Sequence, residues 1–144
     1  GEIGGVKFVN DSKATNVDAT LKALSAFAPH TAIFLLGGND KGTDLDELVE
    51  ACDAKCKAVV CFGAAGERFF DAFANAGVKH VRAEHMEDAL DTAISMAQSG
   101  DEVVLSPACS SFDEFTGYVQ RGEVFQGWVA ALAANEAVCE AAHE

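Results

Sequence analysis

The sequence has 144 residues, of which 49% are hydrophobic, and 10 basic against 23 acidic residues give it a formal net charge of −13. A chain this acidic lacks the positive face that non-specific nucleic-acid binding and anionic membranes require, so we expect neither as a partner. The longest strand-like apolar run, 32–36, is much shorter than the about 20 residues of a membrane-spanning helix, which excludes a span.

Short apolar runs alternate with helical patterns along the chain. Predicted strands lie at 6–9, 32–36, 58–62, 78–82 and 102–105. Apolar residues recur at helical spacing within 17–27, 45–52 and 86–97, and an alanine-rich stretch over about 122–142 predicts a long C-terminal helix that packs back on the sheet.

Some helix ends can also be predicted. Thr15 to Asp18 and Thr43 to Asp46 resemble capping boxes, with Asp in place of the usual Glu or Gln. Pro29 is expected to close the first helix.

The repeated order of strand, helix and strand predicts right-handed crossovers. We therefore expect a Rossmann-like doubly wound α/β fold, with a mostly parallel sheet of about five to six strands and helices on both faces. No linker, low-complexity tract or internal repeat interrupts the sequence, so we expect residues 1–144 to form a single domain.

The five cysteines are an odd number with no C-x-x-C spacing, and no signal-like segment precedes them. This usage is typical of reduced thiols, so we expect a cytoplasmic protein. No histidine lies at a zinc-finger spacing from Cys52 or Cys56, and we predict no metal site in this chain.

Polar loops follow three of the predicted strands, at 10–16, 37–43 and 106–113. Ligands of open parallel sheets collect at the carboxyl ends of the strands, so these loops are the best candidates for a site. In the first loop, Asp11, Ser12, Lys13 and Thr15 could hold a phosphate, a ribose or an amino-acid carboxylate. The same residue types are also ordinary in turns and helix caps, and this structural interpretation stays open.

The second loop contains Gly37 and Gly38, which could let the backbone approach a ligand closely, and Lys41, a cation at the ligand edge of an acidic chain. Alternatively, Lys41 is a solvated loop lysine. The loop matches neither G-x-x-x-x-G-K-[ST] nor G-x-G-x-x-G, so the chain alone has no P-loop.

The third loop carries three serines and Cys109. A serine nucleophile would need a general base and a G-x-S-x-G turn is missing, while no basic residue lies near Cys109 in sequence to lower its pKa. Ser111 to Glu114 also reads as a capping box. We therefore favour a binding role for these hydroxyls over covalent catalysis.

Together and in this order, the three loops resemble those of the C-terminal domain of the Mur ligases, over essentially the whole chain. The matching segments are Asn-Asp-Ser-Lys-Ala-Thr-Asn at 10–16, Leu-Gly-Gly-Asn-Asp-Lys-Gly at 36–42, Leu-Ser-Pro-Ala-Cys-Ser-Ser-Phe-Asp at 105–113, Phe115, and Arg-Gly at 121–122. Sister ligases and folylpolyglutamate synthases carry an Asp-Tyr-Ala-His or Asp-Gly-Ala-His type of sequence in the first loop, where this chain has Asp-Ser-Lys-Ala. The resemblance therefore points to the D-glutamate-adding member of the family.

The resemblance implies a ligase of peptidoglycan synthesis. In that family ATP phosphorylates a carboxylate, here that of UDP-N-acetylmuramoyl-L-alanine, and the amine of D-glutamate attacks the acyl phosphate. It also implies that a UDP-binding domain and a central ATPase domain, with the P-loop and the Mg²⁺ ligands, precede this chain. The start at Gly1 rather than Met agrees with a piece of a longer protein. We expect the isolated domain to fold without catalysing or stably binding ATP or Mg²⁺, and the enzyme to be a monomer.

The resemblance also assigns D-glutamate ligands. Lys41 and Thr15 would hold its α-carboxylate, and Ser111, helped by backbone N–H groups near Phe112 and Tyr118, its side-chain carboxylate. Tyr118 stands where the related pattern has Phe, a harmless change if only the backbone N–H contributes.

The same resemblance assigns ATP contacts but no catalytic residue in this domain alone. Asp11 would accept from the ATP ribose, and Lys13 would lie near the phosphates. Two alternatives remain: the acceptor domain of a sister Mur or folylpolyglutamate ligase, and a free-standing α/β module that binds a small anion.

Overall fold

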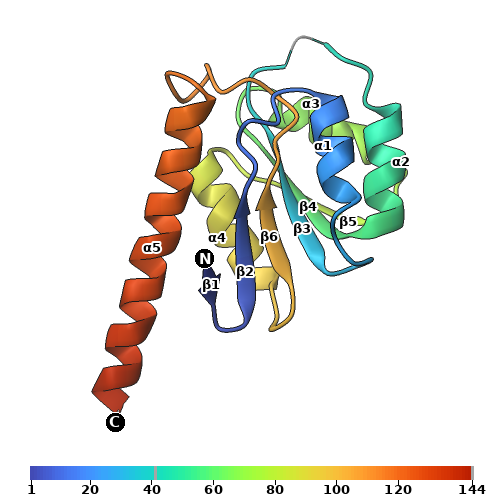
Figure 1. Ribbon diagram of the computed structural model, residues 1–144. Coiled ribbons are helices and arrows are strands. Elements are labelled where there is room, and N and C mark those ends of the chain that lie inside the picture. Colours follow the sequence, from blue (N-terminus) through green and yellow to red (C-terminus); the bar gives the residue numbers. More distant parts are fainter. Residues whose placement is uncertain (41, 144) are drawn as a thin grey trace.

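Six strands form one sheet in the order β1-β2-β6-β3-β4-β5 (Figure 1). The computed structural model describes residues 1–40 and 42–143, with side chains as far as residue 135. The strands are β1 (Glu2–Ile3), β2 (Val6–Asn10), β3 (Ala32–Gly37), β4 (Cys56–Phe62), β5 (Lys79–Arg82) and β6 (Glu102–Leu105). β1 pairs antiparallel to β2 and every other pairing is parallel, which confirms the predicted mostly parallel sheet.

Helices cover both faces of this sheet, as predicted (Figure 1). They are α1 (Val17–Leu24), α2 (Asp46–Lys55), α3 (Gly66–Ala72), α4 (Met86–Met96) and α5 (Tyr118–His143). Phe34 and Leu36 of β3 belong to the core formed with α1, α2 and α3, whereas Ile33 and Leu35 belong to the core formed with α4 and α5.

The central strand β3 shows why the sheet forms. Ile33, Phe34, Leu35 and Leu36 are all fully buried, as expected of a parallel strand covered on both faces. Each such side chain contributes roughly 1.5–3 kcal/mol of burial free energy, so this run fixes the strand at the middle of the fold.

Two helix starts differ from prediction. Asn16, not Thr15, caps α1, because its side-chain oxygen accepts from the Ala19 N–H at 2.9 Å. The capping box expected at Thr43 is also wrong: Asp44 accepts the Asp46 N–H at 2.9 Å instead, directly before α2.

The end of α1 differs as well. The helix stops at Leu24, five residues before Pro29, and Ser25 takes the cap position. Its backbone N–H and hydroxyl both donate to the Lys22 carbonyl, and Phe27 donates to Leu24, so tight turns replace the helical pattern before the proline.

The last helix starts earlier than predicted, at Tyr118. Phe125 and Val129 are buried in the core, so packing of this helix on the sheet is confirmed for that stretch. Figure 1 shows α5 passing along the β1 side of the sheet and ending beyond it. Within the part of the chain described, no helix has the length and apolar character needed to cross a membrane.

Candidate functional site

The candidate loops lie together because of the strand order. The chain passes from β2 to β3, continues outward through β4 and β5, and then returns to place β6 between β2 and β3. The carboxyl ends of β2, β6 and β3 are therefore neighbours at one edge of the sheet, which is where doubly wound folds bind ligands.

Backbone hydrogen bonds hold these loops to one another. Ala108 N–H donates to the Ala14 carbonyl at 3.0 Å, joining the loops after β6 and β2. Asn39 and Ser110 exchange two such bonds, at 2.9 and 3.2 Å, joining the loops after β3 and β6. These backbone bonds therefore tie the three candidate loops together.

Gly37 and Gly38 serve this cross-linking. A Cβ on Gly37 would lie 1.9 Å from the Phe62 carbonyl oxygen, and one on Gly38 would lie 2.4 Å from that of Ser110, with φ of +146° and +130°. Close approach between backbone segments therefore requires both glycines. The sequence-based interpretation, in which they admit a ligand, stays a prediction.

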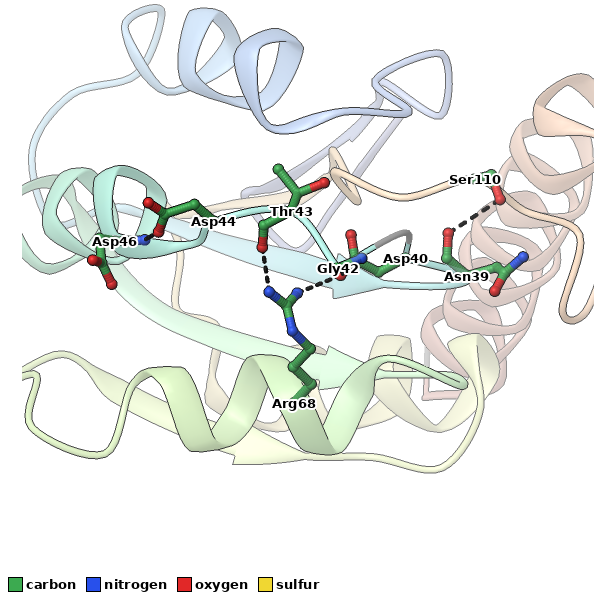
Figure 2. Close-up of polar contacts among 8 residues, drawn as sticks. All are labelled: Asn39, Asp40, Gly42, Thr43, Asp44, Asp46, Arg68 and Ser110. Atoms are coloured by element: carbon green, nitrogen blue, oxygen red, sulfur yellow. Dashed lines mark hydrogen bonds and ion pairs between the residues drawn. The ribbon is translucent and has the colours of Figure 1, made fainter.

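The loop after β3 is held by Arg68 of α3 (Figure 2). The guanidinium donates to the Asp40 carboxylate and to the Thr43 carbonyl, and the same carboxylate accepts the Gly42 N–H at 3.1 Å. Sequence reasoning missed Arg68, since a helical arginine ordinarily reads as a solvated surface residue.

Four of the predicted D-glutamate ligands line one open hollow of about 610 Å³, namely Thr15, Ser111, Phe112 and Tyr118. The fifth, Lys41, lies outside the described residues. The structure therefore brings together residues from the loop after β2, the loop after β6 and the start of α5.

Ser111 is the most unusual group in this hollow. It is 1% exposed, and its hydroxyl oxygen has no hydrogen-bond partner among the residues that the structure describes. A buried polar group without a partner costs about 1–3 kcal/mol, so such groups are uncommon and call for a specific reason. The expected capping box is wrong here, because the Ser111 carbonyl accepts the N–H groups of Glu114 and Phe115 in a turn and no helix begins.

Thr15 also borders a second hollow, of about 290 Å³. This hollow is closed by Asn39, Asp40 and Thr43 of the loop after β3. Thr15 therefore stands between the Ser111 hollow and the loop that carries position 41.

Asp11 and Lys13 line a separate groove of about 600 Å³, together with Lys22 and Phe27. The Asp11 carboxylate accepts the Ser106 hydroxyl at 2.8 Å. This bond and the full burial of Ser106 give that serine a structural role and remove it as a nucleophile candidate.

Arg121, at the start of α5, is a buried residue to which the sequence assigned no role. Only 1% of it is exposed, and its guanidinium donates to the Ser12 hydroxyl, the Ser12 carbonyl and the Cys109 carbonyl at 2.8, 2.7 and 3.0 Å. Ser12 in turn donates to the Tyr118 carbonyl at 2.7 Å, and its N–H is accepted by Asn10 at 3.1 Å. Asn10 and Ser12 thus shape the first loop.

Cys109 is held as a neutral thiol. Burial raises its pKa to about 12, so the thiolate needed for nucleophilic catalysis is scarce at neutral pH. The sequence-based preference against a catalytic thiol agrees with this. Among the residues described, no cluster of three His, Cys, Asp or Glu side chains could hold a metal ion.

The fold and the site define an α/β domain with a polar, hydroxyl-lined hollow at the carboxyl edge of a parallel sheet. The chain belongs to the Mur ligase, glutamate ligase domain family, whose model matches residues 1–109. The resemblance read from the three loops is confirmed.

Individual relatives agree with this family. The UDP-N-acetylmuramoylalanine--D-glutamate ligase of Thiobacillus denitrificans is 43% identical over 136 residues, 94% of this chain and 29% of that protein. Ligases of the same name from Christiangramia forsetii and Geobacillus kaustophilus are each 42% identical over 125 residues, 87% and 86% of this chain. The chain spans less than a third of the length of these curated relatives, 28–29%.

Proposed function

We propose that this chain is the amino-acid-binding domain of a longer, ATP-dependent ligase that adds D-glutamate to UDP-N-acetylmuramoyl-L-alanine in peptidoglycan synthesis. Family membership and relatives of that name at 42–43% identity support the reaction class. The observation that carries the binding role is the buried hydroxyl of Ser111, which has no partner within residues 1–40 and 42–135 and lies in a hollow shared with Thr15.

D-Glutamate carries two carboxylates. A chain of net charge −13 must bind them with hydrogen-bond donors placed at the site itself. In the proposed complex Ser111 donates to the side-chain carboxylate, with the backbone N–H groups near Phe112 and Tyr118. Thr15 and Lys41 hold the α-carboxylate. Tyr118 is 49% exposed, so water can satisfy its hydroxyl and the departure from Phe costs little.

We propose that ATP contacts the groove beside Asp11 and Lys13. The residues present fit a nucleotide: the Ser106 hydroxyl fixes the Asp11 carboxylate for a ribose hydroxyl, and the ammonium groups of Lys13 and Lys22 suit phosphate oxygens. When bound, ATP supplies the phosphoryl group that activates the acceptor carboxylate. We assign the P-loop and the Mg²⁺ ligands to preceding domains.

This assignment treats residues 1–144 as the last domain of a protein roughly three times as long, in line with their 28–29% share of the relatives. We propose that the intact enzyme is a cytoplasmic monomer. The free thiols of Cys52, Cys56, Cys61 and Cys109 support a reducing compartment.

A continuous ATP-consumption assay tests the proposal. The intact protein should turn over ATP only when D-glutamate and the UDP-linked acceptor are both present, and the 144-residue chain alone should not. Turnover with L-lysine, L-alanine or L-glutamate in place of D-glutamate would instead assign a sister ligase. D-Glutamate-dependent turnover by the chain alone would refute the division into domains.

The reading frame upstream of Gly1 offers a second test. A P-loop some hundreds of residues earlier is expected. A start codon directly before Gly1 would contradict the ligase and favour a free-standing binding module.

A further inference from the structure

One buried cation joins the three segments that line the Ser111 hollow. Arg121 lies in the first turn of α5. Its guanidinium donates two hydrogen bonds to Ser12 in the loop after β2 and one to Cys109 in the loop after β6. Ser111 lies two residues beyond Cys109, and Thr15 lies three beyond Ser12. Arg121 therefore adds a side-chain link, besides the backbone bond from Ala108 to Ala14, between the two loops that carry these hydroxyl groups.

The bonding of Arg121 differs from that of an ordinary buried ion pair. All three of its acceptors are neutral oxygens, and it takes part in none of the ion pairs formed by the described residues. Burial lowers its pKa to about 10, which leaves it protonated at neutral pH. The nearby Asp113 and Glu114 carboxylates favour its charged form, so the guanidinium keeps all its hydrogen-bond donors.

We propose that Arg121 is a positioning residue of the amino-acid pocket, which holds Ser111 and Thr15 at the spacing that a dicarboxylate requires. The inference rests on the proposed function, since it takes the hollow to be the D-glutamate site. The planar guanidinium is suited to this role because it presents several donors in a fixed fork, whereas a lysine ammonium cannot reach Ser12 and Cys109 in the same geometry.

A double-mutant cycle in the intact ligase separates positioning from plain stability. Arg121→Lys, Ser111→Ala and the double variant are compared through the KM for D-glutamate and through kcat. We expect Arg121→Lys to raise this KM roughly 10-fold or more, the loss of about one charge-assisted hydrogen bond, with kcat lowered less than about threefold. In the Ser111→Ala background the same substitution should raise KM less than about threefold, because the hydroxyl it positions is gone.

Ser12→Ala probes the same cross-link with Arg121 in place. It removes the acceptor of one guanidinium bond and should raise KM in the same direction by a smaller factor, so the inference stays testable if Arg121→Lys does not fold. Lys57→Met is the matched control, because it removes a partly buried cation that pairs with Asp101 at the amino ends of the strands, away from the hollow. It should lower the melting temperature and leave KM unchanged.

Additive effects in the cycle, or an unchanged KM in a folded Arg121→Lys protein, would overturn the positioning role. An equal rise in KM for Lys57→Met would also overturn it, because it would trace the effect to stability. A wild-type ligase without D-glutamate-dependent turnover would overturn the proposed function and this inference with it. The two failures are therefore distinguishable.

Discussion

Replacing Ser111 with alanine should move stability and ligand affinity in opposite directions. In the free protein the hydroxyl is buried without a partner in the described part of the chain, a state that costs about 1–3 kcal/mol. Ser111→Ala removes that cost, so the free energy of unfolding should rise, by up to about 3 kcal/mol. For a domain of this size each kcal/mol raises the melting temperature by about 2–4 °C.

The bound state should respond with the opposite sign. A hydrogen bond to a carboxylate contributes about 1.5–3 kcal/mol, so its loss should weaken apparent D-glutamate affinity roughly 10–150-fold. Calorimetric unfolding of the ligand-free protein measures the first effect, and the KM for D-glutamate of the intact ligase measures the second.

Thr20→Val is the matched control for stability, because Thr20 is an equally buried hydroxyl with partners: it donates to the Ser106 carbonyl at 3.0 Å. Its loss should lower the melting temperature. A lower melting temperature for Ser111→Ala together with an unchanged KM would refute the reasoning, since the hydroxyl would then serve the fold and not the ligand.

Further predictions concern the loop after β3 and the buried thiols. Lys41→Ala should weaken apparent D-glutamate affinity roughly 10–150-fold through loss of a charged hydrogen bond, and an unchanged KM would remove Lys41 from the site. Arg68→Ala removes the cation beside Asp40, whose side chain is only 5% exposed, so it should raise that KM severalfold and lower the free energy of unfolding by about 1–3 kcal/mol; urea unfolding measures the second effect, and an unchanged KM would count against the first. Burial raises the pKa of Cys61 and of Cys109 from 9.0 to about 12, so the unfolded chain loses these protons first and stability should fall as pH rises from 9 toward 12. Urea unfolding at pH 8 and pH 10 checks this, and equal stabilities would contradict it.

The fold was largely predictable where burial and periodicity agree. A continuous apolar run such as 32–36 predicts a central parallel strand, and the structure places β3 there with both faces covered. The two-residue strand β1 was missed because it is too short to show an alternation of apolar and polar residues. Helix ends were less predictable, since Thr15 and Asn16 are both good caps and only backbone geometry chooses Asn16.

The site was predictable as a set of loops but not as a set of contacts. The loops that carry Thr15 and Ser111 could be proposed from sequence, because they follow strands whose carboxyl ends meet, and the family resemblance then assigned these two residues. Arg121 could not be assigned a role in this way: its bonds to Ser12 cross 109 residues, and a helical arginine is ordinarily exposed. The Arg-Gly pair at 121–122, noted as part of the family pattern, was the available signal.

The central claim is that the edge lined by Thr15 and Ser111 binds D-glutamate. Titration of the isotope-labelled chain with D-glutamate and then L-glutamate, followed by amide chemical shifts, tests it most directly. The account predicts shifts confined to residues 11–16, 39–43 and 109–118, with clear preference for the D isomer. Shifts elsewhere on the sheet, or an equal response to both isomers, would contradict it.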